Sequence, residues 1–235
     1  MNQPQSAVGN CLDVQSFINA QPLSRYQWRV VILCFLIVFL DGLDTAAMGF
    51  IAPALSQDWG IDRASLGPVM SAALIGMVFG ALGSGPLADR FGRKVVLVGA
   101  VLLFGAFSLA SAYSTNVDQL LVLRFLTGLG LGAGMPNATT LLSEYTPERH
   151  KSLLVTSMFC GFNLGMAGGG FISAKLIPAF GWHSLLLIGG VLPLILALVL
   201  VLWLPESARY LVVRNRGTDK AVSYTHLTLP TILLV

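Results

Sequence analysis

The sequence has few charged residues, and this shortage excludes an ordinary soluble domain. Only 11% of its 235 residues are Asp, Glu, Lys or Arg, whereas 55% are hydrophobic. Soluble domains carry about 25% charged residues. Lipid-facing and tightly packed helices have no use for charge, so the composition indicates a membrane protein. The small net charge of +3 gives no reason to expect a nucleic-acid partner.

Cysteine and histidine are also scarce, which removes several kinds of chemistry. The three cysteines, Cys11, Cys34 and Cys160, lie in a polar tail or in apolar runs, so no disulfide framework is expected. No His, Cys and Asp cluster has the spacing of metal ligands, and no nucleophile–base pair is apparent. We therefore expect no metal site and no enzymatic activity. Residues 1–24 lack the short apolar core of a cleavable signal peptide.

Long hydrophobic runs are what the sequence has in abundance. A helix needs roughly 20 apolar residues to cross a bilayer. Short loops join the runs, so neighbouring helices are expected to be antiparallel, and the glycines within them favour close packing in lipid. The predicted fold is thus an all-α bundle of six transmembrane helices, at about residues 28–50, 65–88, 95–113, 119–141, 152–175 and 182–204.

The Lys and Arg residues are crowded at one end of this predicted bundle. Only Arg63 and Lys175 fall at the other end. By the positive-inside rule the crowded end is cytoplasmic, so both termini are expected in the cytoplasm of a multi-pass inner-membrane protein. An even number of spans requires the same arrangement. The crowded end carries Arg25, Arg29, Arg90, Arg93, Lys94, Arg149, Lys151, Arg209, Arg214, Arg216 and Lys220.

Four segments follow from this pattern. Residues 1–24 are interpreted as a loosely ordered cytoplasmic arm, and residues 25–204 as the six-helix bundle. Residues 205–220 are typical of a helix exit followed by an amphipathic cytoplasmic segment. Residues 221–235, "AVSYTHLTLPTILLV", are too short to span and have no helix cap. We interpret them as a foreign reading-frame extension, and the alternative is a natural disordered tail.

The stretch "GPLADRFGRK", Gly85 to Lys94, links the second and third predicted spans. Gly85 would let one helix end approach another closely, and Gly92 would permit a tight turn. Asp89 is expected to pair with a cation or to cap a helix N-terminus. A plain basic loop explains Arg90, Arg93 and Lys94 but not the spacing of the whole motif.

This spacing resembles the signature loop of the major facilitator superfamily. "RFLTGLGLG", Arg124 to Gly132, resembles the fourth-helix motif of that superfamily, and "PESARYL", Pro205 to Leu211, resembles the segment after its sixth helix. "DGLDTAAMGFIAP", Asp41 to Pro53, is similar to the first-helix signature of its aromatic acid:proton symporters. The resemblance covers about residues 20–217.

The resemblance implies a function and an incomplete architecture. Members of the superfamily have twelve spans in two six-helix halves, so this chain corresponds to an N-terminal half that lacks its C-terminal partner. The implied function is proton-coupled import of aromatic acids such as 4-hydroxybenzoate or protocatechuate, with the proton as coupling ion and no other cofactor. Two alternatives remain open: a porter of the same superfamily for another organic anion or metabolite, and a truncated bundle that does not transport.

Asp41 and Asp44 interrupt the first apolar run, where a charge is costly. They are three residues apart and so share one helix face. The first span places both in its outer half, and Arg124 of the fourth span lies at a similar depth. At 1.5 Å rise per residue the depths of Asp44 and Arg124 agree within roughly 5 Å. Arg124 is therefore the predicted partner of Asp44.

Three ionisable groups do not neutralise one another as a simple pair. One carboxylate can compensate Arg124, and the other remains free to titrate, as proton coupling requires. Asp41 is predicted to lie nearer the bilayer centre and is the candidate proton carrier. Arg124 can in addition bind a substrate carboxylate through two hydrogen bonds. The alternative is a static ion pair that only fixes the helix register.

Two weaker patterns complete the set. Glu144, Arg149, Glu206 and Arg209 are predicted to form a cytoplasmic charge network with Asp89 and Arg93, and the alternative is a group of solvated loop charges. "GLGLGA", Gly128 to Ala133, fits a dinucleotide fingerprint in form. It lies inside a membrane span with no preceding strand, so we interpret it as small-residue helix packing.

Overall fold

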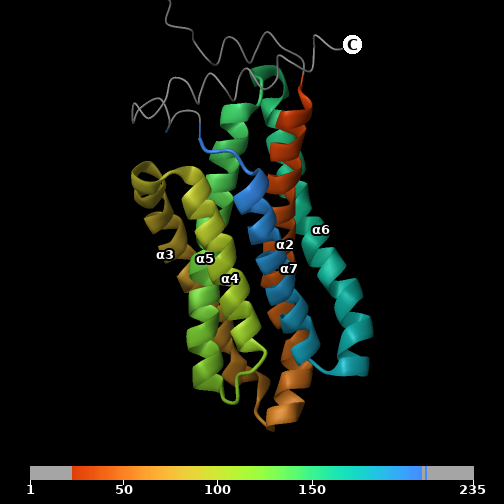
Figure 1. Ribbon diagram of the computed structural model, residues 1–235. Coiled ribbons are helices and arrows are strands. Elements are labelled where there is room, and N and C mark those ends of the chain that lie inside the picture. The colour runs from red at the N-terminus through yellow and green to blue at the C-terminus, as the bar shows by residue number, and fades with distance from the viewer. Residues whose placement is uncertain (1–22, 208–209, 211–235) are drawn as a thin grey trace, which may run out of the picture.

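Six long helices run up and down side by side, with short links between them (Figure 1). The computed structural model describes residues 23–207 and residue 210. No strand occurs among these residues, and each long helix is long and apolar enough to cross a membrane, which confirms the predicted class. The elements are α2 (Arg25–Trp59), the 3-10 helix η1 (Arg63–Leu66), α3 (Gly67–Phe91), α4 (Arg93–Ser111), α5 (Val117–Tyr145), α6 (Glu148–Phe180) and α7 (His183–Trp203).

The start of α2 and the end of α7 lie at the same end of the bundle, which is the top of Figure 1. We call this the basic end, because α2, α3, α4 and α6 bring their Lys and Arg residues to it; the other end is the far end. The basic end carries Arg25, Arg29, Arg90, Arg93, Lys94, Arg149 and Lys151.

Some predictions lie outside the described residues. They are those for most of residues 1–24, for Arg209 and most of 205–220, and for 221–235.

The first helix is longer than its apolar run, and this corrects its predicted end. α2 does not stop near residue 50 but continues through Pro53 to Trp59. Its C-terminus is closed by Gly60, which has a left-handed backbone (φ 62°) and donates its N–H to the Ser56 carbonyl. Hydropathy detects only the part of a helix that lies in lipid, so the polar last turns were missed. Asp41 and Asp44 therefore lie on either side of Gly42, the middle residue of α2, so that Asp44 is in the half toward the far end and Asp41 is not.

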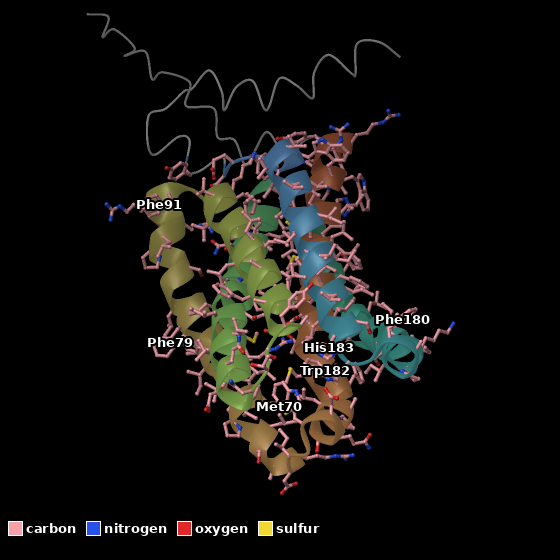
Figure 2. The ribbon with its side chains drawn as sticks, turned by 60° about the horizontal axis from the view of Figure 1, so that its bottom comes forward. Met70, Phe79, Phe91, Phe180, Trp182 and His183 are labelled. Atoms are coloured by element: carbon pink, nitrogen blue, oxygen red, sulfur yellow. The ribbon has the colours of Figure 1, made fainter. Side chains whose placement is uncertain are left out.

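A similar extension carries α6 to Phe180, past the predicted end at residue 175. The far end is then tied together by aromatic side chains. Trp182, in the α6–α7 link, donates its indole N–H to Asp58 of α2 at 3.0 Å and packs edge-on against Trp59. Figure 2 shows Trp182 and His183 beside Phe180 at this end.

Two pairs of helices approach so closely that backbone touches backbone. α3 packs mainly on α5, and α2 packs mainly on α6. A Cβ at Gly128 of α5 would overlap the Ala73 carbonyl of α3, and a Cβ at Gly132 would overlap the Met77 carbonyl. A Cβ at Gly165 of α6 would likewise overlap the Phe39 carbonyl of α2. The prediction that "GLGLGA" serves helix packing is confirmed.

α2 is the most enclosed helix, and α3 and α6 are the most exposed. Of the most apolar 18 residues in each, 67% are buried in α2 but only 22% in α3 and 28% in α6. The exposed side chains of α3 and α6 include many large apolar ones, which suits contact with lipid or with another apolar surface. These side chains are Met70, Leu74, Ile75, Val78, Phe79, Leu82, Leu87 and Phe91 on α3, and Leu153, Phe159, Leu164, Met166, Phe171 and Phe180 on α6.

Candidate functional site

An ion pair lies in the middle of the bundle, between α2 and α5. Nη1 of Arg124 donates to Oδ2 of Asp44 at 2.9 Å. The two side chains are only 1% and 2% exposed, so both charges are removed from solvent. This is the pairing that the depth argument predicts. Because isolated charges at this position would each cost several kcal/mol, each residue requires the other.

Asp44 is held from more than one side. Its second oxygen, Oδ1, accepts a hydrogen bond from the fully buried Ser108 hydroxyl of α4 at 2.6 Å. α7 leaves room for this contact at Gly189, where a Cβ would lie 3.4 Å from both Asp44 Oδ1 and Ser108 Oγ. The carboxylate is therefore fixed in orientation, with one oxygen on the hydroxyl and the other on the guanidinium.

Arg124 and Asp41, unlike Asp44, have side-chain atoms that lack a hydrogen-bond partner among the described residues. Nε and Nη2 of Arg124 are buried and make no hydrogen bond to the described residues, and the same holds for Oδ2 of Asp41. The other oxygen of Asp41 accepts only a long hydrogen bond, 3.4 Å, from Thr45 Oγ1. A buried polar group without a partner is expensive, so such atoms in a native site indicate a missing ligand, water or proton.

A cavity of about 150 Å³ lies next to Asp44 and Arg124, between α2, α3 and α5. Asp44, Thr45 and Arg124 are the polar residues of its lining. The rest of the wall is apolar and is built largely from α3, whose Met70 lies toward the far end from Phe91 (Figure 2). The apolar lining residues are Met48, Met70, Ala73, Leu74, Met77 and Leu131.

A second charged cluster lies at the basic end. Arg93, at the start of α4, forms an ion pair with Glu144 near the end of α5, with 3.2 Å between Nε and Oε1. Glu144 also accepts a hydrogen bond from the Ser207 hydroxyl at 2.6 Å. These side chains are partly exposed, 18% for Arg93 and 15% for Glu144. The predicted network is thus present for these two residues, and Ser207 joins it.

Glu206 closes the N-terminus of α4. Its carboxylate accepts the backbone N–H of Lys94 at 3.0 Å and that of Ser207 at 3.0 Å. Gly92 is the one residue between α3 and α4, and its φ of 98° favours glycine. A Cβ at Gly92 would also lie 2.7 Å from the Glu206 carboxylate. The predicted tight turn at Gly92 is confirmed.

Two predictions for the α3–α4 loop are not met among the described residues. Asp89 does not cap α4, because Glu206 occupies that position; Asp89 is exposed, and no ion pair to it occurs among the described residues. Gly85 does not mediate a close approach in this part of the chain, since a Cβ there would meet nothing within 4 Å. Arg90 lies with its guanidinium carbon 5.4 Å from the Phe91 ring centroid, and Arg149 is exposed at the start of α6.

Sequence reasoning missed Ser108, Ser207 and the methionines of the cavity. A single hydroxyl in an apolar helix has the same appearance as small-residue packing, so Ser108 gave no signal. Ser207 is a short polar residue in an expected loop. The spacing of Met70, Ala73, Leu74 and Met77 on one helical face would have been the available signal, because these residues line the same cavity as Asp44.

Six apolar helices around a buried ion pair and an open cavity are the architecture of a multi-pass helical membrane protein. Residues 34–233 match the family model described as Major Facilitator Superfamily. The chain therefore belongs to the major facilitator superfamily.

Similar proteins carry related names. The chain is 91% identical over 220 residues to the 4-hydroxybenzoate transporter PcaK of Pseudomonas putida, covering 94% of this chain and 49% of that protein. It is 57% identical to a gallate transporter of Pseudomonas putida, covering 87% of this chain and 45% of the relative. The chain thus spans about half the length of the curated relatives it matches.

The fold also matches solved structures. An inward open structure of the xylose transporter XylE from E. coli aligns with a TM-score of 0.70 and 20% sequence identity. The alignment covers 88% of this chain and 57% of that chain. At this identity the likeness supports the fold alone.

Proposed function

We propose that this bundle is one half of a proton-coupled secondary transporter that imports aromatic acids such as 4-hydroxybenzoate or protocatechuate. The names of the similar proteins, a 4-hydroxybenzoate transporter and a gallate transporter, support the substrate class. Transport by alternating access would rock this bundle against a second six-helix half, with the substrate near the bilayer midplane. The proposal therefore concerns the full-length carrier.

The observation that carries the proposal is the incomplete pairing of Arg124. One guanidinium nitrogen binds Asp44, Nε and Nη2 have no partner among the described residues, and Arg124 is one of the residues that line the cavity. These two nitrogens lie on one edge of the planar group and can bind both oxygens of a carboxylate. A substrate carboxylate at this edge would complete the hydrogen bonding of Arg124.

The two aspartates take different roles in this proposal. Asp44 stays on Arg124 and Ser108 and maintains the position of the guanidinium. Asp41 has no cationic partner among the described residues and one oxygen without any partner, so it is the carboxylate that a transported proton would neutralise. Proton release from Asp41 on one side of the membrane would then be coupled to substrate release.

The orientation follows from the basic end. Seven Lys and Arg residues from four helices lie there, whereas Arg63 and Lys175 are the Lys and Arg residues near the far end. We infer that the basic end faces the cytoplasm and that the carrier resides in the inner membrane. Reporter fusions after residues 20 and 217 should both report a cytoplasmic position, and one periplasmic readout would contradict the orientation.

The test of function is uptake by the full-length carrier in proteoliposomes. Labelled 4-hydroxybenzoate should accumulate when only an inward proton gradient is imposed, and unlabelled protocatechuate or gallate should compete with it. Shikimate and xylose serve as non-aromatic competitors and should have little effect. Accumulation of either of these in place of the aromatic acid would refute the assigned substrate class.

A further inference from the structure

The cavity beside Arg124 has two chemically different ends. Its polar end consists of the Asp44 carboxylate and the Arg124 guanidinium, with Thr45 next to them. Its remaining wall contains Met48, Met70 and Met77 together with Ala73, Leu74 and Leu131. Three of the seven methionines of the chain thus line this one cavity.

The size of the cavity restricts what can fill it. Typical ligand pockets have volumes of about 300–1,000 Å³, so a cavity of about 150 Å³ is too small for most whole ligands. An apolar cavity of about 150 Å³ is known to take up benzene. The apolar part of this cavity therefore suits a single six-membered aromatic ring.

The character of the wall favours an aromatic occupant over an aliphatic one. Thioether sulfur makes favourable contacts with aromatic rings, often at the ring edge, and unbranched methionine side chains adapt to substituents. Met48 is buried, at 4% exposure, whereas Met70, which also lines the cavity, is 38% exposed. The occupant would thus meet a buried methionine on α2 and less buried ones on α3.

We propose that this cavity seats the aromatic ring of the substrate, and that Met70 and Met77 of α3 determine its selectivity for monocyclic aromatic carboxylates. The ring lies between α2 and α3 while its carboxylate binds Nε and Nη2 of Arg124. This inference rests on the proposed function, because it assigns the ring position of the same substrate.

The backbone holds the two methionines at a defined distance from Arg124. Met70, Ala73, Leu74 and Met77 follow one another on one face of α3. Two contacts fix the separation of that face from α5: Gly128 against the Ala73 carbonyl and Gly132 against the Met77 carbonyl. The width of the seat is therefore set by helix packing, and the side chains adjust only its lining.

The experiment measures uptake kinetics of 4-hydroxybenzoate by the full-length carrier in proteoliposomes. Met70→Ala and Met77→Ala should raise KM about 3- to 10-fold with the maximal rate preserved, since they remove ring contacts but no charge. The matched control is Met166→Ala on α6, where a methionine of similar exposure, 37%, lies outside the cavity lining. This variant should change KM less than about 2-fold.

Competitors of different shape distinguish a ring seat from a general apolar wall. Benzoate should inhibit the unmodified carrier better than cyclohexanecarboxylate, which has the same carboxylate and ring size without an aromatic face. Met77→Ala should improve inhibition by 2-naphthoate, because it enlarges the seat. Met70→Leu and Met77→Leu keep the volume and should preserve folding while reducing the preference for benzoate over cyclohexanecarboxylate.

The outcomes separate this inference from the proposed function. If the unmodified carrier takes up no aromatic acid, the proposed function and the ring seat both fall. If it does, but KM in Met70→Ala and Met77→Ala stays within the range of Met166→Ala, the ring seat alone is wrong. An unchanged benzoate preference in both leucine variants would also overturn it.

Discussion

The Arg124–Asp44 pair in the middle of the bundle and the Arg93–Glu144 pair at the basic end contain the same two chemical groups in different circumstances. The first pair is 1% and 2% exposed, and two nitrogens of its guanidinium have no partner among the described residues. The second pair is 18% and 15% exposed, and Glu144 also accepts the Ser207 hydroxyl. Oε1 of Glu144 likewise makes no hydrogen bond to the described residues, although it lies 3.2 Å from Nε of Arg93. Missing partners cost more in the buried pair, where water is absent.

This contrast teaches that the surroundings of a charge indicate its role better than the charge itself. At the basic end, carboxylates are used to complete helix ends, as Glu206 does for Lys94 of α4. In the middle of the bundle, two donors of Arg124, a residue that lines the cavity, have no partner among the described residues. The predictions below test whether the charged residues at the basic end stabilise the fold while those in the middle of the bundle bind substrate.

The largest effect is expected from Arg124. Arg124→Ala leaves Asp44 buried without a cation, which typically costs about 3–5 kcal/mol, so uptake of 4-hydroxybenzoate by the full-length carrier should fall at least about 100-fold. Arg124→Lys keeps the charge but loses the planar edge, and should not restore uptake. Arg93→Lys is the control and should retain most uptake. Equal losses in the two lysine variants would erase the contrast between the pairs.

The second effect separates the two aspartates within the buried site. Asp41→Asn imitates a permanently protonated side chain, so it should retain exchange of substrate across the membrane while losing accumulation driven by a proton gradient. Asp44→Asn leaves Arg124 without its counter-ion and should impair both activities. Both are measured in proteoliposomes with and without an imposed gradient. Accumulation by Asp41→Asn under a proton gradient alone would show that the roles are assigned wrongly.

A smaller effect on stability, not on binding, is expected at the turn between α3 and α4. Gly92→Ala would introduce strain at φ 98° and crowd the Glu206 carboxylate, at a cost of about 1–3 kcal/mol. The apparent melting temperature in detergent should fall, while KM for substrate stays unchanged. Gly85→Ala is the control, because nothing lies within 4 Å of its Cβ, and it should melt like the unmodified protein.

The smallest effect is expected from the exposed pair itself. Glu144→Gln removes the charge but keeps an acceptor for Ser207, so its cost in stability should be about 0–1 kcal/mol. Raising the salt concentration should lower the stability of the unmodified protein toward that of the variant. A loss in stability larger than that of Gly92→Ala would place this pair among the structural requirements of the bundle.

The sequence was sufficient for features that depend on one helix or on depth in the membrane. Six apolar runs gave six helices, and the depths of Asp44 and Arg124 gave their contact. Contacts between segments that are far apart in the sequence could not be predicted from it. Glu206 caps α4 from 112 positions away in the sequence, and no periodicity connects them. The last polar turns of α2 were invisible to hydropathy for a related reason, since helices continue beyond the lipid.

The backbone contacts of Gly128 and Gly132 have a consequence for how the substrate specificity of the full-length protein can evolve. Side chains that line the seat can be exchanged without altering these closest contacts between α3 and α5, because the contacts join backbone to backbone. The two glycines admit no larger residue without separating the helices. Directed evolution toward bulkier acids should therefore collect its mutations at Met70, Leu74 and Met77, and leave the glycine frame untouched.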